Sequence, residues 1–331
     1  GCDSASDEPA GGSSSSGGSS SGGSGGGSSG GSAIAPEANI KVAFIGDSEA
    51  GTDFRSVLNL IESEGANLVL HQGDFDYQDD PELFFSVIDQ ELGADFPYLG
   101  SIGNHDNAAW TGAGGYAERF SQRMARIGIT PDEPNLEDEM YSTAYRGLRL
   151  VFVGENGNND EFAQYLNDQL INDQHIVKIC SWHKNQAAMQ VGGKGNEMGW
   201  QVYENCLQQG AIIVTGHEHS YSRTRTLIGA EQQQVDSTCA EPNQLCVGPG
   251  RTFVTVSGLG GRGVRDQERC LPETFPYGCN QEWASIYAAQ QGANFGVMFI
   301  TFNVGGDPRK ARGYFKDIAG SMVDEFDVTF D

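Results

Sequence analysis

The chain contains 331 residues, and its 20 Lys and Arg residues against 45 Asp and Glu residues give a formal net charge of −25. A field of this sign repels nucleic acids, because binding to a phosphate backbone depends on Lys and Arg, so nucleic-acid binding is excluded as the main role. No apolar run approaches the roughly 20 residues that a membrane-spanning helix needs, so we expect no such helix in this sequence.

The first 38 residues are predicted to be a disordered tether. Residues 11–32 are all Gly or Ser, a composition that behaves as a flexible coil. The start Gly1-Cys2 resembles the end of a bacterial lipoprotein signal, in which a small residue precedes the Cys that receives a lipid. That resemblance implies that Cys2 is lipidated, and that the protein is exported to the bacterial cell envelope or surface and contacts the membrane only through this anchor. The alternative is an ordinary disordered N-terminus with an incidental Cys.

Residues 39–331 are expected to form one domain, because a single hydrophobic core can grow to roughly 250 to 300 residues. Short apolar runs that end in small or polar residues predict buried strands at 41–47, 67–74, 97–106, 149–156, 176–183 and 211–219. Amphipathic stretches between them predict helices at 54–65, 81–92, 116–128, 161–170 and 198–209. Later runs with few helices between them favour antiparallel strands at 252–261, 295–304, 311–320 and 322–330. The predicted fold class is α/β, a layered sandwich.

Six further cysteines predict a disulfide framework. Four of them form two pairs close in sequence, each within a loop rich in Pro, Glu and Gly that a short disulfide would stabilise. The remaining two lie in an apolar strand and on the following helix, so they pair by elimination. The predicted pairs are Cys239 with Cys246, Cys270 with Cys279, and Cys180 with Cys206. Because disulfides persist outside the cytosol, they support an exported, secreted protein; reduced buried thiols in a cytosolic protein are the alternative.

Polar side chains follow the predicted strands at the point where each strand ends. In chain order they are Asp47, Asp74, Asn104 with His105, His183, and His217 with His219. Open α/β sheets place their sites at the carboxyl ends of strands, so we expect these groups to meet at one edge. Carboxylate, amide and imidazole groups are the ligands that two adjacent cations require. The sequence therefore predicts a metal site with two ions.

The segments that carry these residues resemble the calcineurin-like metallophosphoesterase superfamily. They read GD at 46–47, GDFDY at 73–77, GNHD at 103–106, SWH at 181–183 and GHEH at 216–219. The first motif of that superfamily is usually Asp-x-His, whereas this chain has Asp47-Ser48-Glu49. The second motif fits the Gly-Asp-x-x-Tyr pattern of the purple acid phosphatases, in which a Tyr phenolate replaces the missing His. The resemblance implies that Tyr77 is a metal ligand and that the domain is an α/β/β/α sandwich with mixed sheets.

The resemblance also implies how the two metal ions are shared. The first ion would be held by Asp47, Asp74, Tyr77 and His219, and the second by Asp74, Asn104, His183 and His217, with Asp74 as the bridge. Because a phenolate is a hard anionic donor, the expected cofactors are Fe(III) in the first site and Fe, Zn or Mn in the second. In the alternative, Glu49 replaces Tyr77 as a ligand and the pair is manganese or zinc.

The function implied by this ligand set is hydrolysis of phosphate esters, with metal-bound hydroxide as the nucleophile. His105 is the predicted proton donor to the leaving group, and Asp106 is predicted to orient its ring. The expected partner is a phosphorylated small molecule, with a phosphomonoester as the first hypothesis. A manganese-dependent phosphodiesterase or nucleotidase that uses Glu49 is the second hypothesis. A surface-tethered binding protein without catalytic turnover is the third.

Other polar residues near the motifs are weaker candidates. Lys184, Tyr221 and Arg223 flank the predicted ligands and are proposed as substrate contacts. Arg262 lies in a Gly-rich run at 257–263 and is proposed as a further substrate contact. Flanking polar residues are more often solvated surface. His71 lies within an apolar strand and is predicted to be a packed core residue.

Overall fold

Two large sheets account for most strands of the protein. The computed structural model describes residues 32–133, 135–155 and 159–331, and Ala33–Asp331 form one compact unit. The first sheet has the order β11 (Gln244–Val247), β16 (Met322–Phe330), β15 (Lys310–Asp317), β14 (Gly296–Phe302), β1 (Ile40–Ile45), β2 (Leu68–His71) and β3 (Tyr98–Gly100). The second has the order β13 (Trp283–Tyr287), β8 (Tyr221–Thr224), β12 (Val254–Ser257), β7 (Ile212–Thr215), β6 (Val177–Ser181), β5 (Leu148–Phe152) and β4 (Tyr141–Tyr145). A separate hairpin pairs β9 (Leu227–Gly229) with β10 (Gln234–Val235).

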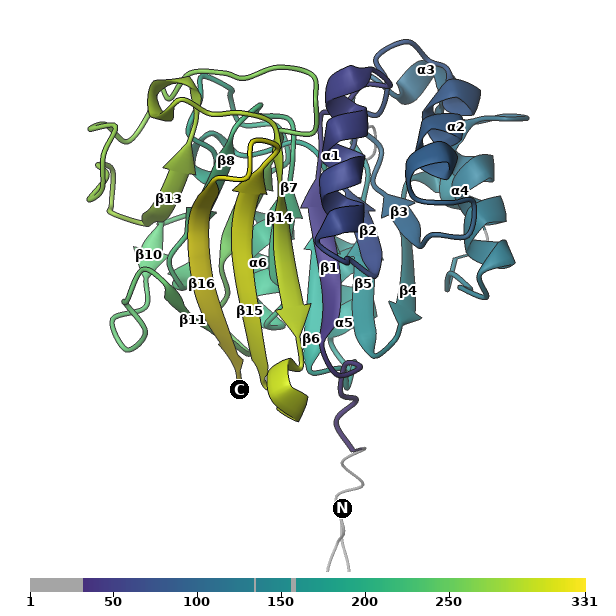
Figure 1. Cartoon of the computed structure of the whole chain (residues 1–331). Coiled ribbons are helices and arrows are strands. Elements are labelled where there is room, and N and C mark those ends of the chain that lie inside the picture. The colour runs from purple at the N-terminus through teal and green to yellow at the C-terminus, as the bar shows by residue number, and fades with distance from the viewer. Residues whose placement is uncertain (1–31, 134, 156–158) are drawn as a thin grey trace, which may run out of the picture. The chain divides into compact units, whose positions relative to one another are not determined.

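Helices cover the outer face of each sheet, which gives the four layers of the predicted α/β/β/α sandwich (Figure 1). On the first sheet lie α1 (Thr52–Ser63), α2 (Pro81–Glu91), α3 (Asn107–Trp110) and α4 (Tyr116–Arg126). On the second lie α5 (Asn159–Leu170) and α6 (Gln201–Gln208). Short 3₁₀ turns complete the described elements, namely η1 (Leu136–Asp138), η2 (Ala187–Met189), η3 (Ala289–Gln291) and η4 (Val304–Gly306).

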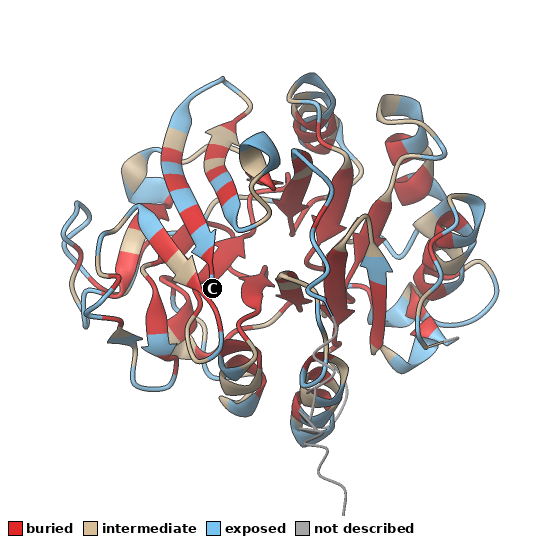
Figure 2. Ribbon diagram, turned by 90° about the horizontal axis from the view of Figure 1, so that it is seen from below, coloured by how far each residue is buried: buried red, intermediate tan, exposed pale blue. Residues whose placement is uncertain are grey.

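The first sheet contains buried parallel strands and half-exposed antiparallel strands, and what covers each strand explains the difference. Strands β1, β2 and β3 are parallel and completely buried or nearly so, because helices cover them on one side and the second sheet on the other. Strands β15 and β16 are antiparallel and alternate between buried and exposed residues, because their outer face meets solvent. Figure 2 shows the buried residues concentrated in the sheets and on the inner faces of the helices.

Local sequence explains where the helices begin and which face they bury. Helix α1 buries Phe54, Val57, Leu58 and Ile61, and this spacing places all four on one face. Helix α2 begins with Pro81 in its first turn, and the side chain of Asp80 accepts a hydrogen bond from Leu83 N at 3.0 Å. Such an N-cap satisfies an otherwise unpaired backbone donor.

The domain begins earlier in the chain than the predicted boundary at residue 39. Ile34 pairs with His175 ahead of β6, and Asn303 donates a side-chain hydrogen bond to the carbonyl of Pro36 at 2.7 Å. Glu37 forms an ion pair with Arg146. Residues 33–38 are therefore fixed by backbone and ionic contacts and belong to the domain. Residues 1–31 of the predicted tether (1–38), with Cys2, lie outside the described residues.

The predicted helices and the six early strands are present, and β14, β15 and β16 form the expected antiparallel meander. The run at 252–261 differs, because β12 is antiparallel to β8 but parallel to β7. The three disulfides join the predicted partners, Cys180–Cys206, Cys239–Cys246 and Cys270–Cys279. The first of them ties β6 to α6 across the second sheet and its helix layer. In the described part of the chain, none of the helices has the length and apolar character needed to cross a bilayer.

Candidate metal centre

The predicted ligands lie just beyond the carboxyl ends of buried strands. Asp47 follows β1, Asp74 follows β2, and His217 follows β7. These three residues and Tyr77 have positive φ angles of 53°, 58°, 68° and 58°, respectively. Backbone in this left-handed region is unfavourable for residues other than glycine and clusters at functional sites. The chain therefore turns sharply at each strand end and directs the side chain across the sheet edge.

Two glycines allow the loops of this edge to approach one another closely. A Cβ atom at Gly103 would lie 2.2 Å from the backbone nitrogen of Asp74. A Cβ atom at Gly258 would lie 2.1 Å from the carbonyl of Glu218 and 2.8 Å from Asp47 Oδ2. Both distances are too short for any side chain, so glycine is required where backbone passes directly beneath the predicted ligands.

One group of side chains converges on the Tyr77 hydroxyl. Tyr77 Oη lies 3.3 Å from Asp47 Oδ1, 3.2 Å from Asp74 Oδ2 and 3.3 Å from His219 Nε2. His219 Nε2 is itself 3.3 Å from Asp47 Oδ1. Three oxygen atoms and one imidazole nitrogen thus face a common centre.

A second group shares Asp74 with the first. His183 Nε2 lies 3.2 Å from Asp74 Oδ2 and 3.1 Å from His217 Nδ1. The ligand atoms of these three buried residues all lie within 4.8 Å of one another, as a metal site requires. Asn104 lines the same cavity, and its Oδ1 atom is buried with no hydrogen-bond partner among the described residues.

The arrangement fits a pair of metal ions. Asp74 Oδ2 lies between the two groups, in the position of a bridging ligand. Buried polar atoms nearly always have a partner, so the unpaired Asn104 Oδ1 indicates that something other than protein binds it. The first group is rich in oxygen and the second in imidazole nitrogen, and both are donor types that metal ions use in proteins.

Further contacts orient the imidazole rings. His183 Nδ1 lies 2.6 Å from the carbonyl of Gln72, which accepts its proton and leaves Nε2 facing Asp74. His217 Nε2 lies 3.0 Å from Glu197 Oε2, which leaves Nδ1 facing His183. The sequence prediction missed Glu197, because it lies in a loop between η2 and α6 that has no periodic pattern.

The charges in the cluster interact strongly. Burial opposes a charged His183, but the carboxylate of Asp74 outweighs this effect and raises the pKa of His183 to about 9. Burial and the carboxylates of Asp47 and Asp74 raise the pKa of the Tyr77 phenol above its usual value. The cluster therefore holds protons on Tyr77 and His183 when no other cation balances Asp47 and Asp74.

His105 lies at the mouth of this cluster. Its ring centroid is 4.6 Å from that of Tyr77, its side chain lines the cavity, and its backbone nitrogen donates a hydrogen bond to Asp74 Oδ1 at 2.9 Å. Asp106 does not have the predicted role of orienting this ring. It is buried beneath the loops and accepts hydrogen bonds from the backbone nitrogens of Asp74, Phe75 and Gly103 at 2.7 to 2.8 Å. It therefore fixes the two ligand loops to each other.

Two of the flanking residues are not available to substrate. Tyr221 and Arg223 lie in β8 and are completely buried. Arg223 Nε and Nη2 donate to the two oxygens of Asp324 at 2.7 and 2.9 Å, and Tyr221 Oη donates to Asp324 Oδ2 at 2.7 Å. These residues form a structural link between the two sheets, which corrects their predicted role as substrate contacts.

Two further residues have partners within the protein. The Nζ atom of Lys184 lies 2.5 Å from Glu155 Oε2, and Lys184 is not among the residues that line the metal cavity.

His71 is fully buried, as predicted, with its Nε2 atom 2.9 Å from Ser48 Oγ. Burial lowers the pKa of His71 to about 3, so the ring is neutral in the core.

Basic residues line the opening of the metal cavity, whose volume is about 140 Å³. Arg262 lies over the Tyr77 ring at 4.5 Å and pairs with Glu49, so Glu49 is engaged at the rim. Lys194 and Arg265 also line the cavity, and the sequence prediction missed both. The only feature that could have indicated them in the sequence is their positive charge, because neither residue is part of a motif.

Glu218 is a further residue that the prediction missed. It lies between the two predicted ligands His217 and His219 in sequence, and both of its carboxylate oxygens are buried without a hydrogen-bond partner among the described residues. Burial raises the pKa of Glu218 to about 7, although the nearby charges of Arg265 and Lys194 oppose this.

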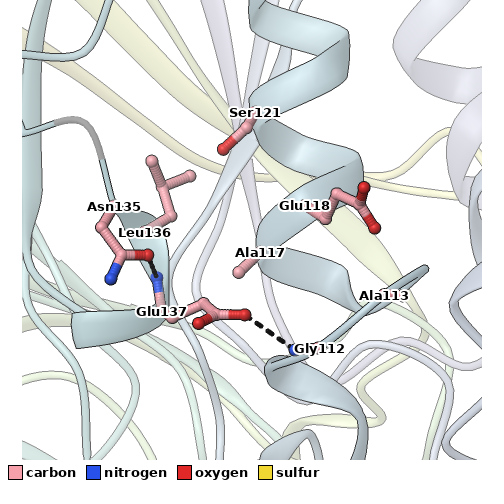
Figure 3. A pocket seen from close by; sticks show the side chains of 8 residues that line it. All are labelled: Gly112, Ala113, Ala117, Glu118, Ser121, Asn135, Leu136 and Glu137. Carbon is pink, nitrogen blue, oxygen red and sulfur yellow. Dashed lines mark hydrogen bonds between the residues drawn. The ribbon is translucent and has the colours of Figure 1, made fainter.

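A second cavity, of about 390 Å³, lies beside α4 and η1, and its lining residues include no cluster of potential metal ligands. Its two acidic side chains accept hydrogen bonds from backbone nitrogens. Glu137 accepts one from Gly112 at 2.7 Å (Figure 3), and Glu118 accepts one from Gly114. Because these carboxylates are already paired and no imidazole lines this cavity, it does not compete with the metal centre as the candidate site.

Comparisons with known proteins agree with this geometry. Residues 40–221 match the family model of the calcineurin-like phosphoesterases. A search of curated protein sequences finds no significant match.

Among solved structures, the chain is similar to the purple acid phosphatase PPD1 from yellow lupin (Lupinus luteus), with a TM-score of 0.62 and 17% identity over 89% of this chain and 54% of that one. The chain thus spans about half the length of that phosphatase. It is also similar to GAP50, the anchor in the inner membrane complex of Plasmodium, with a TM-score of 0.56 and 11% identity over 89% of this chain and 90% of the other. PhoD gives a TM-score of 0.51 and 11% identity over 88% of this chain and 73% of its own. At these identities the likeness concerns the fold.

The family model matches more than half of the chain, and the matched segment carries all the predicted metal ligands. The chain therefore belongs to the calcineurin-like phosphoesterase family.

Proposed function

We propose that this protein hydrolyses phosphate esters with a pair of metal ions, and that phosphomonoesters are its substrates. The observation that carries the proposal is the position of Asp74 Oδ2, at 3.2 Å from both Tyr77 Oη and His183 Nε2. A single carboxylate oxygen between an oxygen-rich group and an imidazole group is what a bridged pair of cations requires.

In this proposal Asp47, Tyr77 and His219 would hold one ion, Asn104, His183 and His217 would hold the other, and Asp74 would contribute to both. When bound, the ions would lower the pKa of a water molecule and stabilise the charge that develops on the phosphoryl oxygens. The protein residues fix the geometry. Gln72 sets which nitrogen of His183 faces the site, the Glu197 carboxylate approaches His217 Nε2 at 3.0 Å, and Asp106 holds the loops of Asp74 and Gly103 together.

His105 is proposed to protonate the leaving group. Hydrolysis forms a bond from the water oxygen to phosphorus and breaks the bond from phosphorus to the ester oxygen, which must gain a proton to leave as an alcohol. His105 is exposed at the cavity and its ring packs against Tyr77, so its side chain can reach the ester oxygen from the solvent side.

Tyr77 rather than Glu49 is proposed as the ligand that replaces the missing His. The Tyr77 hydroxyl lies within 3.3 Å of Asp47, Asp74 and His219, whereas the Glu49 carboxylate is bonded to Arg262 and does not line the cavity. A phenolate ligand favours Fe(III) in this site, with Fe, Zn or Mn in the second.

The proposal can be tested with Asp74→Asn and a matched control, Asp168→Asn, on the exposed face of α5. Metal content would be measured by mass spectrometry, and activity with p-nitrophenyl phosphate and bis-p-nitrophenyl phosphate. Because a metal ion supplies several kcal/mol of transition-state stabilisation, Asp74→Asn should lower kcat/KM by roughly 10³-fold and reduce the metal content. The control should behave as wild type.

Equal activity of wild type and Asp74→Asn would refute the proposal. A visible absorption band in the native protein that Tyr77→Phe abolishes would support Fe(III) bound to Tyr77. A colourless, active enzyme that prefers the diester would favour the manganese-dependent phosphodiesterase.

We also infer that the protein works outside the cytosol. The three disulfides support this inference, because such bonds persist in oxidising compartments. A bacterial envelope location and lipidation of Cys2 stay predictions from the sequence.

A further inference from the structure

Three cationic side chains gather at the metal cavity of a strongly acidic protein. Lys194, Arg262 and Arg265 all line this cavity, although the chain has only 20 Lys and Arg residues against 45 Asp and Glu residues. The three lie in two loops, one between η2 and α6 and one between β12 and β13. Concentration of positive charge at one opening attracts anions there while the rest of the surface repels them.

Two of these cations form no direct ion pair among the described residues. Arg262 is bonded to Glu49 and stacked on Tyr77. In contrast, neither Lys194 nor Arg265 forms an ion pair or a side-chain hydrogen bond with any residue in the described ranges 32–133, 135–155 and 159–331. Lys194 is also partly buried. Because no carboxylate pairs with either cation directly, an anion could still bind to them and offset the cost of partial burial.

The surrounding residues hold these two cations near each other. The backbone nitrogen of Arg265 donates a hydrogen bond to the carbonyl of the predicted ligand His219 at 2.8 Å, and the Arg265 carbonyl accepts one from Ala289 at 2.9 Å. The charge of Arg265 repels that of Lys194, and the buried carboxylate of Glu218 attracts both. The loop of Arg265 is thus fixed beside the metal centre, with two like charges facing the same small space.

The reacting phosphate alone does not account for these charges. In the proposed function its oxygens are balanced by the metal ions, so Lys194 and Arg265 are additional positive charges. The cavity is small, about 140 Å³, so any second anionic group that meets these side chains must be bonded close to the first.

We propose that Lys194 and Arg265 bind a second anionic group of the substrate next to the phosphate that is hydrolysed. The preferred substrates are then compounds with two neighbouring anionic groups, a phosphoanhydride or bisphosphate in the first instance, and not simple monoesters. This inference rests on the proposed function and replaces simple phosphomonoesters with compounds that carry a second anionic group, which include phosphoanhydrides as well as esters.

The test compares the double variant Lys194→Gln/Arg265→Gln with Lys310→Gln/Arg312→Gln, which removes two positive charges from the exposed surface of β15. The substrates are p-nitrophenyl phosphate, inorganic pyrophosphate and 3-phosphoglycerate. A charge-assisted hydrogen bond raises binding affinity by roughly tenfold or more. The Lys194→Gln/Arg265→Gln variant should therefore lower kcat/KM for pyrophosphate by about 10- to 100-fold. It should change kcat/KM for p-nitrophenyl phosphate by less than about threefold. The control should leave both unchanged.

Binding gives an independent measurement. Calorimetric titration of the holoenzyme with methylenediphosphonate and with methylphosphonate should show that wild type prefers the first and that the Lys194→Gln/Arg265→Gln variant loses this preference. In the kinetic test, a higher kcat/KM of wild type for pyrophosphate than for 3-phosphoglycerate identifies phosphate as the second anionic group, and the reverse order identifies carboxylate. Either result supports the proposal.

The proposal is overturned if the double variant weakens hydrolysis of all three substrates equally, or if methylenediphosphonate binds no more tightly than methylphosphonate. If wild type hydrolyses none of the substrates but still distinguishes the two phosphonates, the proposed function fails and the anion site stands.

Discussion

The floor and the rim of the metal cavity are opposite in charge, burial and origin. The floor consists of carboxylates, a phenol and imidazoles that are mostly buried and lie directly after strands. The rim consists of Lys194, Arg262 and Arg265, which lie in loops and are at least partly exposed. A floor of this kind attracts cations, whereas the rim attracts anions. The comparison teaches that the sheets set the geometry of the candidate ligands, whereas the loops set the charge at the opening of the cavity.

Among the residues that are not predicted metal ligands, His105, which lies between the floor and the rim, is expected to have the largest effect on catalysis. His105→Asn should lower kcat by about 10²- to 10⁴-fold, because general acid catalysis contributes this amount, while the metal content stays at the wild-type level. The loss should be larger for an alkyl phosphate than for p-nitrophenyl phosphate, whose leaving group needs no proton. Equal losses with both substrates would contradict the role of His105 as proton donor.

A smaller effect is expected beneath the floor, at Glu197. Because this carboxylate lies 3.0 Å from His217 Nε2 and orients the ring, Glu197→Gln should weaken metal affinity by about 10- to 100-fold. Chelator competition would measure the affinity, and added metal should restore activity. Glu161→Gln, on the exposed face of α5, is the matched control. Unchanged metal affinity in Glu197→Gln would show that His217 needs no such support.

The smallest effect is expected on the rim, at Glu49. Its ion pair with Arg262 is half-exposed, and such pairs contribute only about 0 to 1 kcal/mol. Glu49→Gln should therefore change kcat/KM by less than about fivefold and leave the metal content unchanged. A decrease of about 100-fold in kcat/KM together with loss of metal would instead identify Glu49 as a metal ligand.

The carboxylates, the amide and the imidazoles of the floor could be predicted from the sequence because they follow strands, whereas Tyr77 was predicted only from the resemblance of GDFDY to the Gly-Asp-x-x-Tyr pattern. A buried apolar run ending in a polar residue is visible in the sequence, and parallel strands bring such ends together. His71 could be assigned to the core for the same reason, since it lies within a run and not beyond it. The disulfides were also predictable, because four of the six cysteines are close to their partners in sequence.

The rim and the supporting contacts could not be predicted. Lys194, Arg265 and Glu197 reach the site through loops whose path depends on tertiary packing, and no periodicity marks them. Tyr221 and Arg223 were misassigned because β8 begins right after the GHEH segment, so residues that follow a ligand in sequence enter a buried strand. Their true partner, Asp324, is about a hundred residues away. Asp106 was misassigned because proximity to His105 in sequence does not imply contact between their side chains.

The contacts of residues 33–38 have a practical consequence. Ile34 and Pro36 are attached at the amino ends of β6 and β1 (Figure 1), whereas the metal cavity lies at the carboxyl ends of the same strands. A reporter group attached at Ala33 itself would therefore sit on the side of the domain away from the cavity. Such a label would leave the opening accessible to phosphorylated molecules.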